Sequence, residues 1–176
     1  MSDWQPDWRS WWGDADAGPP TDTMPGDCGV SLLIASTTTV AVFVDSLRAW
    51  PSGLQFTLGM RLSPEMQNLE HPEPTLFPHP AVGRETLLHL ATSFADGSRA
   101  SNDPYPSGDH RLIMRGGGGG GPFWESHWWV APLPPPPTLR ISVEWSAGGL
   151  PLSHVDLDTQ MVADAARRSR PLFAAP

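Results

Sequence analysis

Residues 54–62 read LQFTLGMRL, and residues 138–145 read TLRISVEW. In both stretches every second residue is apolar, which is the period of a strand that buries one face and exposes the other. Half-buried strands of this kind are typical of antiparallel sheets. These two stretches therefore decide the fold class.

Weaker alternation marks further strands on both sides of these two. The expected additional strands are residues 30–35, 39–50, 87–94, 111–115, 123–131 and 153–158. Tight turns are expected at Trp50-Pro51-Ser52-Gly53 and at Asp96-Gly97, because these residue types favour turn conformations. The pattern predicts an all-β fold, an antiparallel β-sandwich of about 7–8 strands. A β-barrel is the second possibility.

One short helix is expected near the C-terminus, over residues 159–170. Its apolar residues share one face, Asp158 or Thr159 can cap its start, and arginines occupy its C-terminal end. The sandwich is therefore predicted to end in a single helix.

The composition restricts the classes of partner. The chain has 176 residues, no lysine, 11 arginines and 19 acidic residues, which gives a net charge of −8. This balance argues against binding to nucleic acid or to anionic membranes, both of which need a basic surface. Cys28 is the only cysteine, so no intrachain disulfide is expected. With neither a signal-peptide pattern nor an apolar span, the expected location is cytoplasmic.

Residues 1–28 differ from the rest and are expected to form an acidic, tryptophan-rich tail. They contain six aspartates and one arginine, with little besides tryptophan to bury, so disorder or a short local helix is expected. Residues 29–176 are expected to form a single β-sandwich domain.

The four tryptophans of this tail are candidate partner-binding residues. Their spacing places them on one face of a helix, with Pro6 at its start and Gly13 just past its end. Such a segment can lie in a groove of a partner, and the nearby aspartates favour a basic one. The alternative is that the same face covers this domain's own sheet. The residues are Trp4, Trp8, Trp11 and Trp12.

A second candidate site lies on the expected strand 123–131. Alternation places Trp124, Trp128 and Val130 on one face and Glu125, His127 and Trp129 on the other. A carboxylate, an imidazole and an indole together can bind a sugar or a small polar ligand. The alternative is that Trp129 packs under a loop or under the terminal helix.

Two low-complexity stretches are expected to be connections. Residues 116–121 are all glycine and are expected to form a flexible hairpin loop, since no lysine follows to make a phosphate-binding loop. Pro132 and residues 134–137 are expected to form an extended connection between two strands.

Catalysis and metal binding find little support. Glu70, His71, Glu73 and His79 are separated by prolines, which is typical of an exposed loop, and His89 and His154 are expected to face solvent or pack under a loop. No nucleophile motif accompanies Cys28. We therefore expect no catalytic residue, no metal and no cofactor.

The run Trp128-Trp129-Val130-Ala131-Pro132-Leu133, followed by prolines and by Val143-Glu144-Trp145, resembles a pattern of uncharacterised bacterial, chiefly actinobacterial, β-rich proteins. The Trp-Pro-Ser-Gly turn, the Phe-Ala-Asp-Gly turn and the alanine-rich terminal helix are similar as well. The resemblance covers about residues 29–173 and implies no activity, because none is assigned to that family.

The sequence thus favours a non-catalytic protein–protein interaction module, with the tryptophan tail as a docking peptide for an unidentified, basic protein. The alternative is a small-ligand or carbohydrate-binding β-sandwich that uses the Trp129 face. An enzyme is the least favoured reading, and the oligomeric state stays open.

Overall fold

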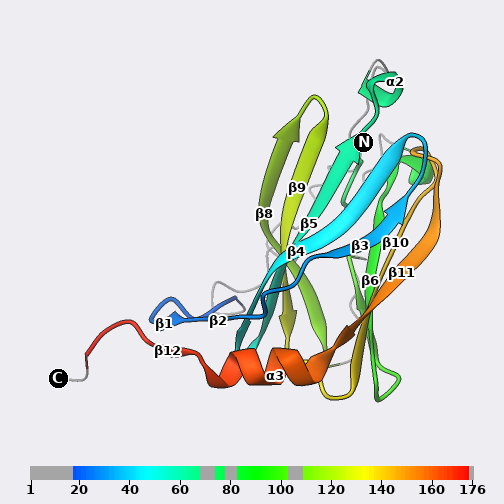
Figure 1. Cartoon of the computed structure of the whole chain (residues 1–176). Coiled ribbons are helices and arrows are strands. Elements are labelled where there is room, and N and C mark those ends of the chain that lie inside the picture. Colours follow the sequence, from blue (N-terminus) through cyan, green and yellow to red (C-terminus); the bar gives the residue numbers. More distant parts are fainter. Residues whose placement is uncertain (1–17, 68–73, 78–82, 103–108, 175–176) are drawn as a thin grey trace, which may run out of the picture.

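The computed structural model describes residues 18–67, 74–77, 83–102 and 109–174, and it confirms the predicted all-β fold. Two antiparallel sheets face each other as a β-sandwich (Figure 1). The larger sheet has the order β2-β4-β5-β9-β8, and β3 also pairs with β4. Its strands are β2 (Gly26–Asp27), β3 (Leu32–Ser36), β4 (Val40–Trp50), β5 (Gly53–Leu62), β8 (Arg111–Gly120) and β9 (Phe123–Ala131).

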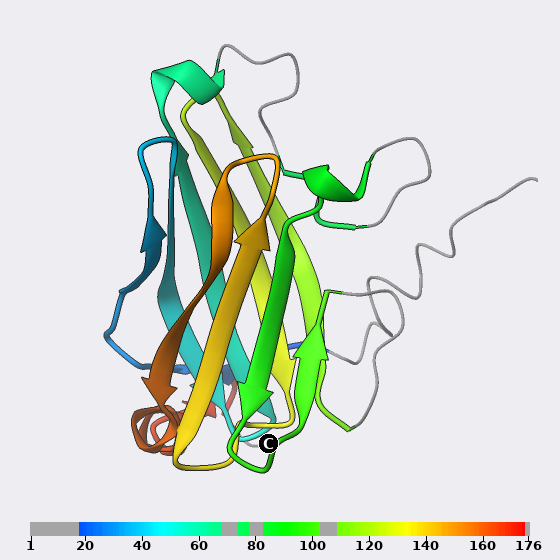
Figure 2. The ribbon, with the colours of Figure 1, turned by 90° about the vertical axis from the view of Figure 1, so that its right-hand side faces the viewer.

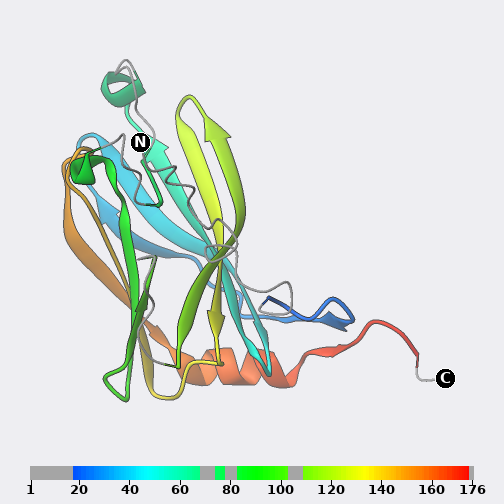
Figure 3. The same cartoon turned by 180° about the vertical axis from the view of Figure 1, so that it is seen from behind.

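The smaller sheet has the order β11-β10-β6-β7, and it lies in front in the view of Figure 2. Its strands are β6 (His89–Phe94), β7 (Arg99–Ser101), β10 (Thr138–Trp145) and β11 (Leu150–Asp158). A separate short ribbon pairs β1 (Thr23–Met24) with β12 (Arg170–Pro171) and extends away from the sandwich (Figures 1 and 3). The helical elements are α2 (Pro64–Gln67), the 3-10 turn η1 (Arg84–Thr86) and α3 (Thr159–Arg167).

The core lies between the sheets and follows the alternation of the two deciding stretches. The even residues of β5 and the odd residues of β10 are buried, while Gln55 and Arg140 point outward. The largest fully buried side chains are Trp128, Trp129, Trp145 and Phe56. The indole N–H of Trp128 donates to Ser126 Oγ over 2.7 Å, so this buried polar group has its partner.

Helix α3 covers one end of the sandwich (Figure 1). Its start matches the prediction, because the side chain of Asp158 accepts a hydrogen bond of 2.8 Å from the backbone N–H of Gln160. Its buried residues join the core, and β2 approaches it very closely. A β-carbon at Gly26 would lie 1.7 Å from the carbonyl oxygen of Ala165, so this contact requires glycine.

Both predicted turns are confirmed. The proline stretch connects β9 to β10 as predicted, but it contains bends and two cis peptide bonds, Ala131-Pro132 and Pro136-Pro137, and is not extended throughout. The prediction of a glycine hairpin loop was wrong: Gly116 to Gly120 belong to β8 and pair with β9, and the turn is at Gly121-Pro122. Glycine has low β-propensity, but pairing with a well-packed neighbouring strand overrides that preference.

The part of the expected tail that the structure describes is attached to the domain. Gly26 and Asp27 pair with Ala49 and Arg48 of β4, and Thr23 and Met24 pair with β12. These pairings use main-chain hydrogen bonds, which the acidic composition of the segment does not reveal. Among the described residues, no helix has both the length and the apolar character needed to cross a membrane.

Candidate functional site

The outer face of the larger sheet carries the candidate residues of strand 123–131. As the alternation predicted, Trp124, Trp128 and Val130 pack toward the core. Glu125, His127 and Trp129 lie on the opposite face, where Trp129 joins a small separate cluster. The sequence therefore placed these six residues of β9 on their correct faces.

Trp129 is buried rather than available to a ligand. It is 1 % exposed and packs with Trp50, with ring centroids 5.6 Å apart in an edge-to-face arrangement, and with Ile113. Its ring also lies across Gly53, where an added β-carbon would be 2.4 Å from Trp129 Cζ2. Trp129 therefore packs inside the protein, which was the alternative that the sequence left open. The ligand hypothesis needs an exposed indole ring on this face, and Trp129 does not provide one.

Glu125 and His127 are held by side chains of the neighbouring strand β5. His127 Nδ1 and Thr57 Oγ1 share a hydrogen bond of 3.0 Å, and an Arg61 guanidinium nitrogen lies 3.7 Å from a carboxylate oxygen of Glu125. Both interactions join directly neighbouring strands. They fix the surface of the sheet and do not direct the two side chains toward a common ligand.

Arg61 also lies against two aromatic rings on this face. Its Cζ is 5.1 Å from the ring centroid of Phe43 and 5.4 Å from that of Phe123, within the range of cation–π contacts. The Phe43 ring covers Gly59, where an added β-carbon would lie 2.4 Å from Phe43 Cζ. Aromatic rings therefore cover glycines at two places on this face.

The outward positions of the second half of β8 carry no side chain at all. We call Gly116, Gly118 and Gly120 the glycine strip; they lie opposite His127, Glu125 and Phe123. At Gly118 and Gly120, no atom of the described residues lies within 4 Å of where a β-carbon would be. Since β8 is the last strand of its sheet, this bare surface is also an edge (Figure 3).

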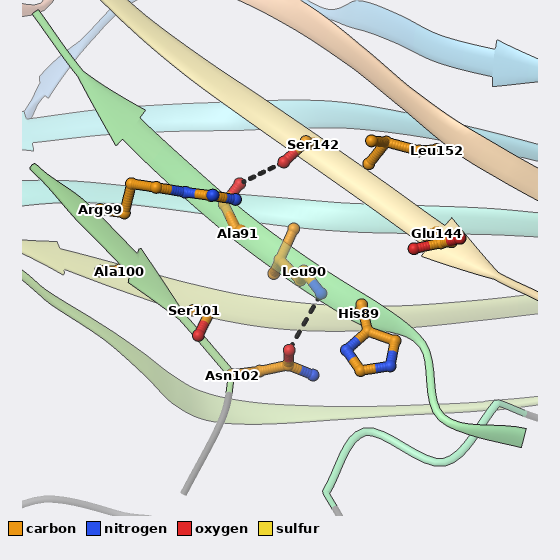
Figure 4. A pocket seen from close by; sticks show the side chains of 10 residues that line it. All are labelled: His89, Leu90, Ala91, Arg99, Ala100, Ser101, Asn102, Ser142, Glu144 and Leu152. Carbon is orange, nitrogen blue, oxygen red and sulfur yellow. Dashed lines mark hydrogen bonds between the residues drawn. The ribbon is translucent and has the colours of Figure 1, made fainter. Parts of the chain in front are cut away.

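The outer face of the smaller sheet has a different character. It contains an open hollow of about 470 Å³, which we call the polar hollow (Figure 4). Its volume lies within the usual range of small-molecule sites. The lining residues that matter below are His89, Ala91, Arg99, Ser142, Glu144 and Leu152.

Asn102 also borders the polar hollow, but its side chain has a structural role. Its Nδ2 donates to the carbonyl oxygens of Leu76 and Leu88 over 2.7 and 2.8 Å, and its Oδ1 accepts from the N–H of Leu90 over 3.0 Å. All of its polar atoms are thereby engaged, so Asn102 holds the wall of the hollow in place.

The remaining candidates are two histidines and the single cysteine. His89 and His154 are exposed, as the sequence predicted. Burial and the neighbouring Asp27 raise the pKa of the Cys28 thiol to about 11, so it is protonated at neutral pH and a poor nucleophile. Within the described ranges, no group of His, Cys, Asp and Glu is arranged to hold a metal ion.

Two groups of candidate residues lie outside the described residues. They are the tryptophans Trp4, Trp8, Trp11 and Trp12 and the loop residues Glu70, His71, Glu73 and His79. The roles expected for the tryptophans stay predictions.

The sequence did not anticipate the glycine strip or the polar hollow. Alternation along β6 and β10 does place His89 and Glu144 on outward faces. That His89 and Glu144 are direct partners depends on the pairing of strands β6 and β10, which are distant in the sequence, and no local pattern contains this information.

Comparison of the chain with protein-family models, with curated proteins and with solved structures gives no match. The resemblance to uncharacterised bacterial proteins accordingly stays a prediction.

Proposed function

We propose that this protein is a non-catalytic protein–protein interaction module, and that the glycine strip is its docking surface. The ligand we assign to the strip is an acidic segment with aromatic side chains. The observation that carries the proposal is the bare surface at Gly118 and Gly120, on the same face where aromatic rings already cover Gly53 and Gly59.

Ring packing supports the choice of an aromatic ligand. Phe43 on Gly59 and Trp129 on Gly53 both place a ring directly on a glycine backbone. A buried aromatic side chain removes roughly 150–250 Å² from water, which makes such contacts strong anchors. Phe123, which is 47 % exposed and pairs with Gly120, extends the apolar surface beside the strip.

Charge supports the choice of an acidic ligand. Strand β8 carries Arg111 and Arg115 and no acidic residue, while on the neighbouring strands the charges of Arg61 and Glu125 offset each other. Electrostatic complementarity of this kind favours encounter and orients the ligand.

The chain's own N-terminal segment has the required chemistry. Residues 1–17 contain Trp4, Trp8, Trp11 and Trp12 together with four aspartates and one arginine. The described structure begins at Gly18, where an added β-carbon would lie 2.9 Å from Cζ of Arg115, next to the strip. The basic partner expected for this segment is then a surface of this chain, on the same copy or on a second one. The cytoplasmic location belongs to this proposal and rests on the single cysteine.

The test uses the full chain with Trp4, Trp8, Trp11 and Trp12 replaced by alanine as the receptor. A synthetic peptide of residues 1–17 is titrated against it by calorimetry. We expect saturable binding that weakens by about tenfold or more when the peptide's tryptophans are replaced by alanine.

A receptor that also carries Gly118→Val is the matched control, because its new side chain occupies the bare surface. Equal binding of the peptide to both receptors, or no binding to either, contradicts the proposal. Binding to the alanine receptor but not to the wild-type chain shows that the wild-type strip is already occupied by an N-terminal segment of this protein.

A further inference from the structure

The polar hollow contains charged groups that the fold itself does not use. The side chains of Arg99 and Glu144, and that of the neighbouring His89, make no hydrogen bond and no ion pair within the described part of the chain. Elsewhere on the same face, Arg140 and Asp156 form a bidentate ion pair, in which Nε and Nη2 of the guanidinium donate to the two carboxylate oxygens over 2.7 and 2.9 Å. On this face, Arg140 and Asp156 thus neutralise each other, whereas Arg99 and Glu144 at the hollow have no partner among the described residues.

The open charges lie at opposite ends of the hollow. Glu144 and His89 are direct partners between β10 and β6, whereas Arg99 extends from β7 at the other end (Figure 4). The floor between them is formed by Ala91 and Ser142, which also pair directly. Both side chains are small, and Ser142 Oγ donates a hydrogen bond of 3.3 Å to the carbonyl oxygen of Ala91, so the floor between the cationic and the anionic end carries no large side chain.

We propose that the polar hollow binds a short peptide through its two charged termini. The carboxylate of the peptide pairs with the guanidinium of Arg99, and its ammonium group pairs with the carboxylate of Glu144. An arginine fork matches a carboxylate geometrically, and such charge-assisted hydrogen bonds are the strongest available to an open site.

The span of the hollow sets the length of the ligand. Arg99 pairs with Ser93 of β6, and Glu144 pairs with His89, four residues away along β6. Their backbones are therefore about 16 Å apart, and the long Arg99 side chain, which extends from β7 toward β6 (Figure 4), shortens the distance that a ligand must span. An extended peptide advances about 3.3 Å per residue, so three residues span about 10 Å, the part of this distance that the Arg99 and Glu144 side chains do not cover. Leu152, which is 69 % exposed at the rim, offers apolar contact to a side chain of the peptide.

A ligand with only one charge fits this site less well. A simple anion satisfies Arg99 and leaves the Glu144 carboxylate without a partner, and a simple cation does the reverse. Only a ligand with both charges, separated by the length of the hollow, engages both ends.

The experiment titrates the full chain with trialanine, with N-acetyl-trialanine, with trialanine amide and with free alanine, using NMR amide shifts to measure affinity. We expect trialanine to bind and each capped form to bind about tenfold or more weakly, because each lacks one charge-assisted contact. Free alanine, which is too short to reach both ends, is expected to bind weakest.

Two variants test which terminus of the peptide each charged residue binds. Arg99→Gln is expected to abolish the difference between trialanine and its amide, and Glu144→Gln the difference between trialanine and its N-acetyl form. Arg140→Gln, on the same face but already paired with Asp156, is the control and is expected to leave all affinities unchanged.

Absence of trialanine binding at millimolar concentration overturns the proposal, as does equal binding of the free and capped peptides. These capping results hold even if one variant fails to fold, because they use the wild-type chain.

Discussion

The two outer faces of this sandwich are built from the same alternating pattern, but different kinds of side chain occupy their outward positions. The larger sheet covers Gly53 and Gly59 with aromatic rings and leaves the glycine strip bare. The smaller sheet has a hollow with small residues at its centre and, at its ends, charged side chains that have no partner among the described residues. The comparison teaches that alternation fixes which side chains face outward, while cross-strand neighbours decide what those side chains can bind.

The largest expected difference between the faces concerns Trp129 and Leu152. Trp129→Ala removes a ring that is 1 % exposed, whereas Leu152→Ala removes a side chain that is 69 % exposed. We expect the first to lower the free energy of unfolding by about 3–5 kcal/mol and the second to change it by less than about 0.5 kcal/mol. Urea denaturation measures both, and a cost below about 1 kcal/mol for Trp129→Ala contradicts its placement in a packed cluster.

The two kinds of glycine provide the next comparison. At Gly53 an added β-carbon would lie 2.4 Å from the Val130 carbonyl oxygen, which belongs to the backbone and has little freedom to move, while Gly118 is open. Gly53→Ala is expected to cost about 1–3 kcal/mol through overpacking. Gly118→Ala is expected to be neutral or to stabilise by up to about 1 kcal/mol, because alanine restricts the unfolded chain. A thermal-melting comparison in which both variants lose equal stability argues against a bare strip.

A smaller difference is expected at the histidines. His127 shares a 3.0 Å hydrogen bond with Thr57, a residue that is almost fully buried, whereas His89 has no such partner among the described residues. Thr57→Val is expected to cost about 1 kcal/mol, the usual net value of one hydrogen bond. His89→Gln serves as the control and is expected to stay within about 0.5 kcal/mol of wild type in the same denaturation measurement.

The smallest expected effect is a shifted titration on the smaller sheet. The hydrogen bonds from Arg140 lower the pKa of Asp156 below its ordinary 3.8. Because the pKa is lowered in the folded state, the contribution of the pair to stability is present above pH 3.8 and is lost as the pH falls through the folded-state pKa. NMR titration of the side-chain carboxyl carbon measures this pKa, and Arg140→Gln is expected to return it toward 3.8. An unchanged midpoint in that variant shows that the pair does not control Asp156.

Much of the fold was predictable because its signal is local. The alternation in residues 54–62, 123–131 and 138–145 assigned each residue to the core or to the outer face, and Asp158 marked the start of the helix. The short strands β1, β2 and β12 were not predictable, because two-residue pairings depend on segments distant in the sequence.

The candidate sites were less predictable for the same reason. Glu125, His127 and Trp129 share a face, but only the structure shows that Trp129 packs on Gly53 and Trp50. The glycine run was interpreted as a loop, since a lone glycine run has no pattern that reveals its pairing with β9.

The most direct test compares the backbone amides whose NMR signals shift when each of the two proposed ligands is added to the same protein. The isotope-labelled full chain with its four N-terminal tryptophans replaced by alanine is titrated first with the peptide of residues 1–17 and then, separately, with trialanine. We expect the peptide to shift the amides of Gly118 and Gly120 and to leave those of Ala91 and Ser142 unchanged, and trialanine to do the reverse. If both ligands shift the same set of amides, or if neither shifts any of these four, the proposal that the two outer faces bind different ligands is contradicted.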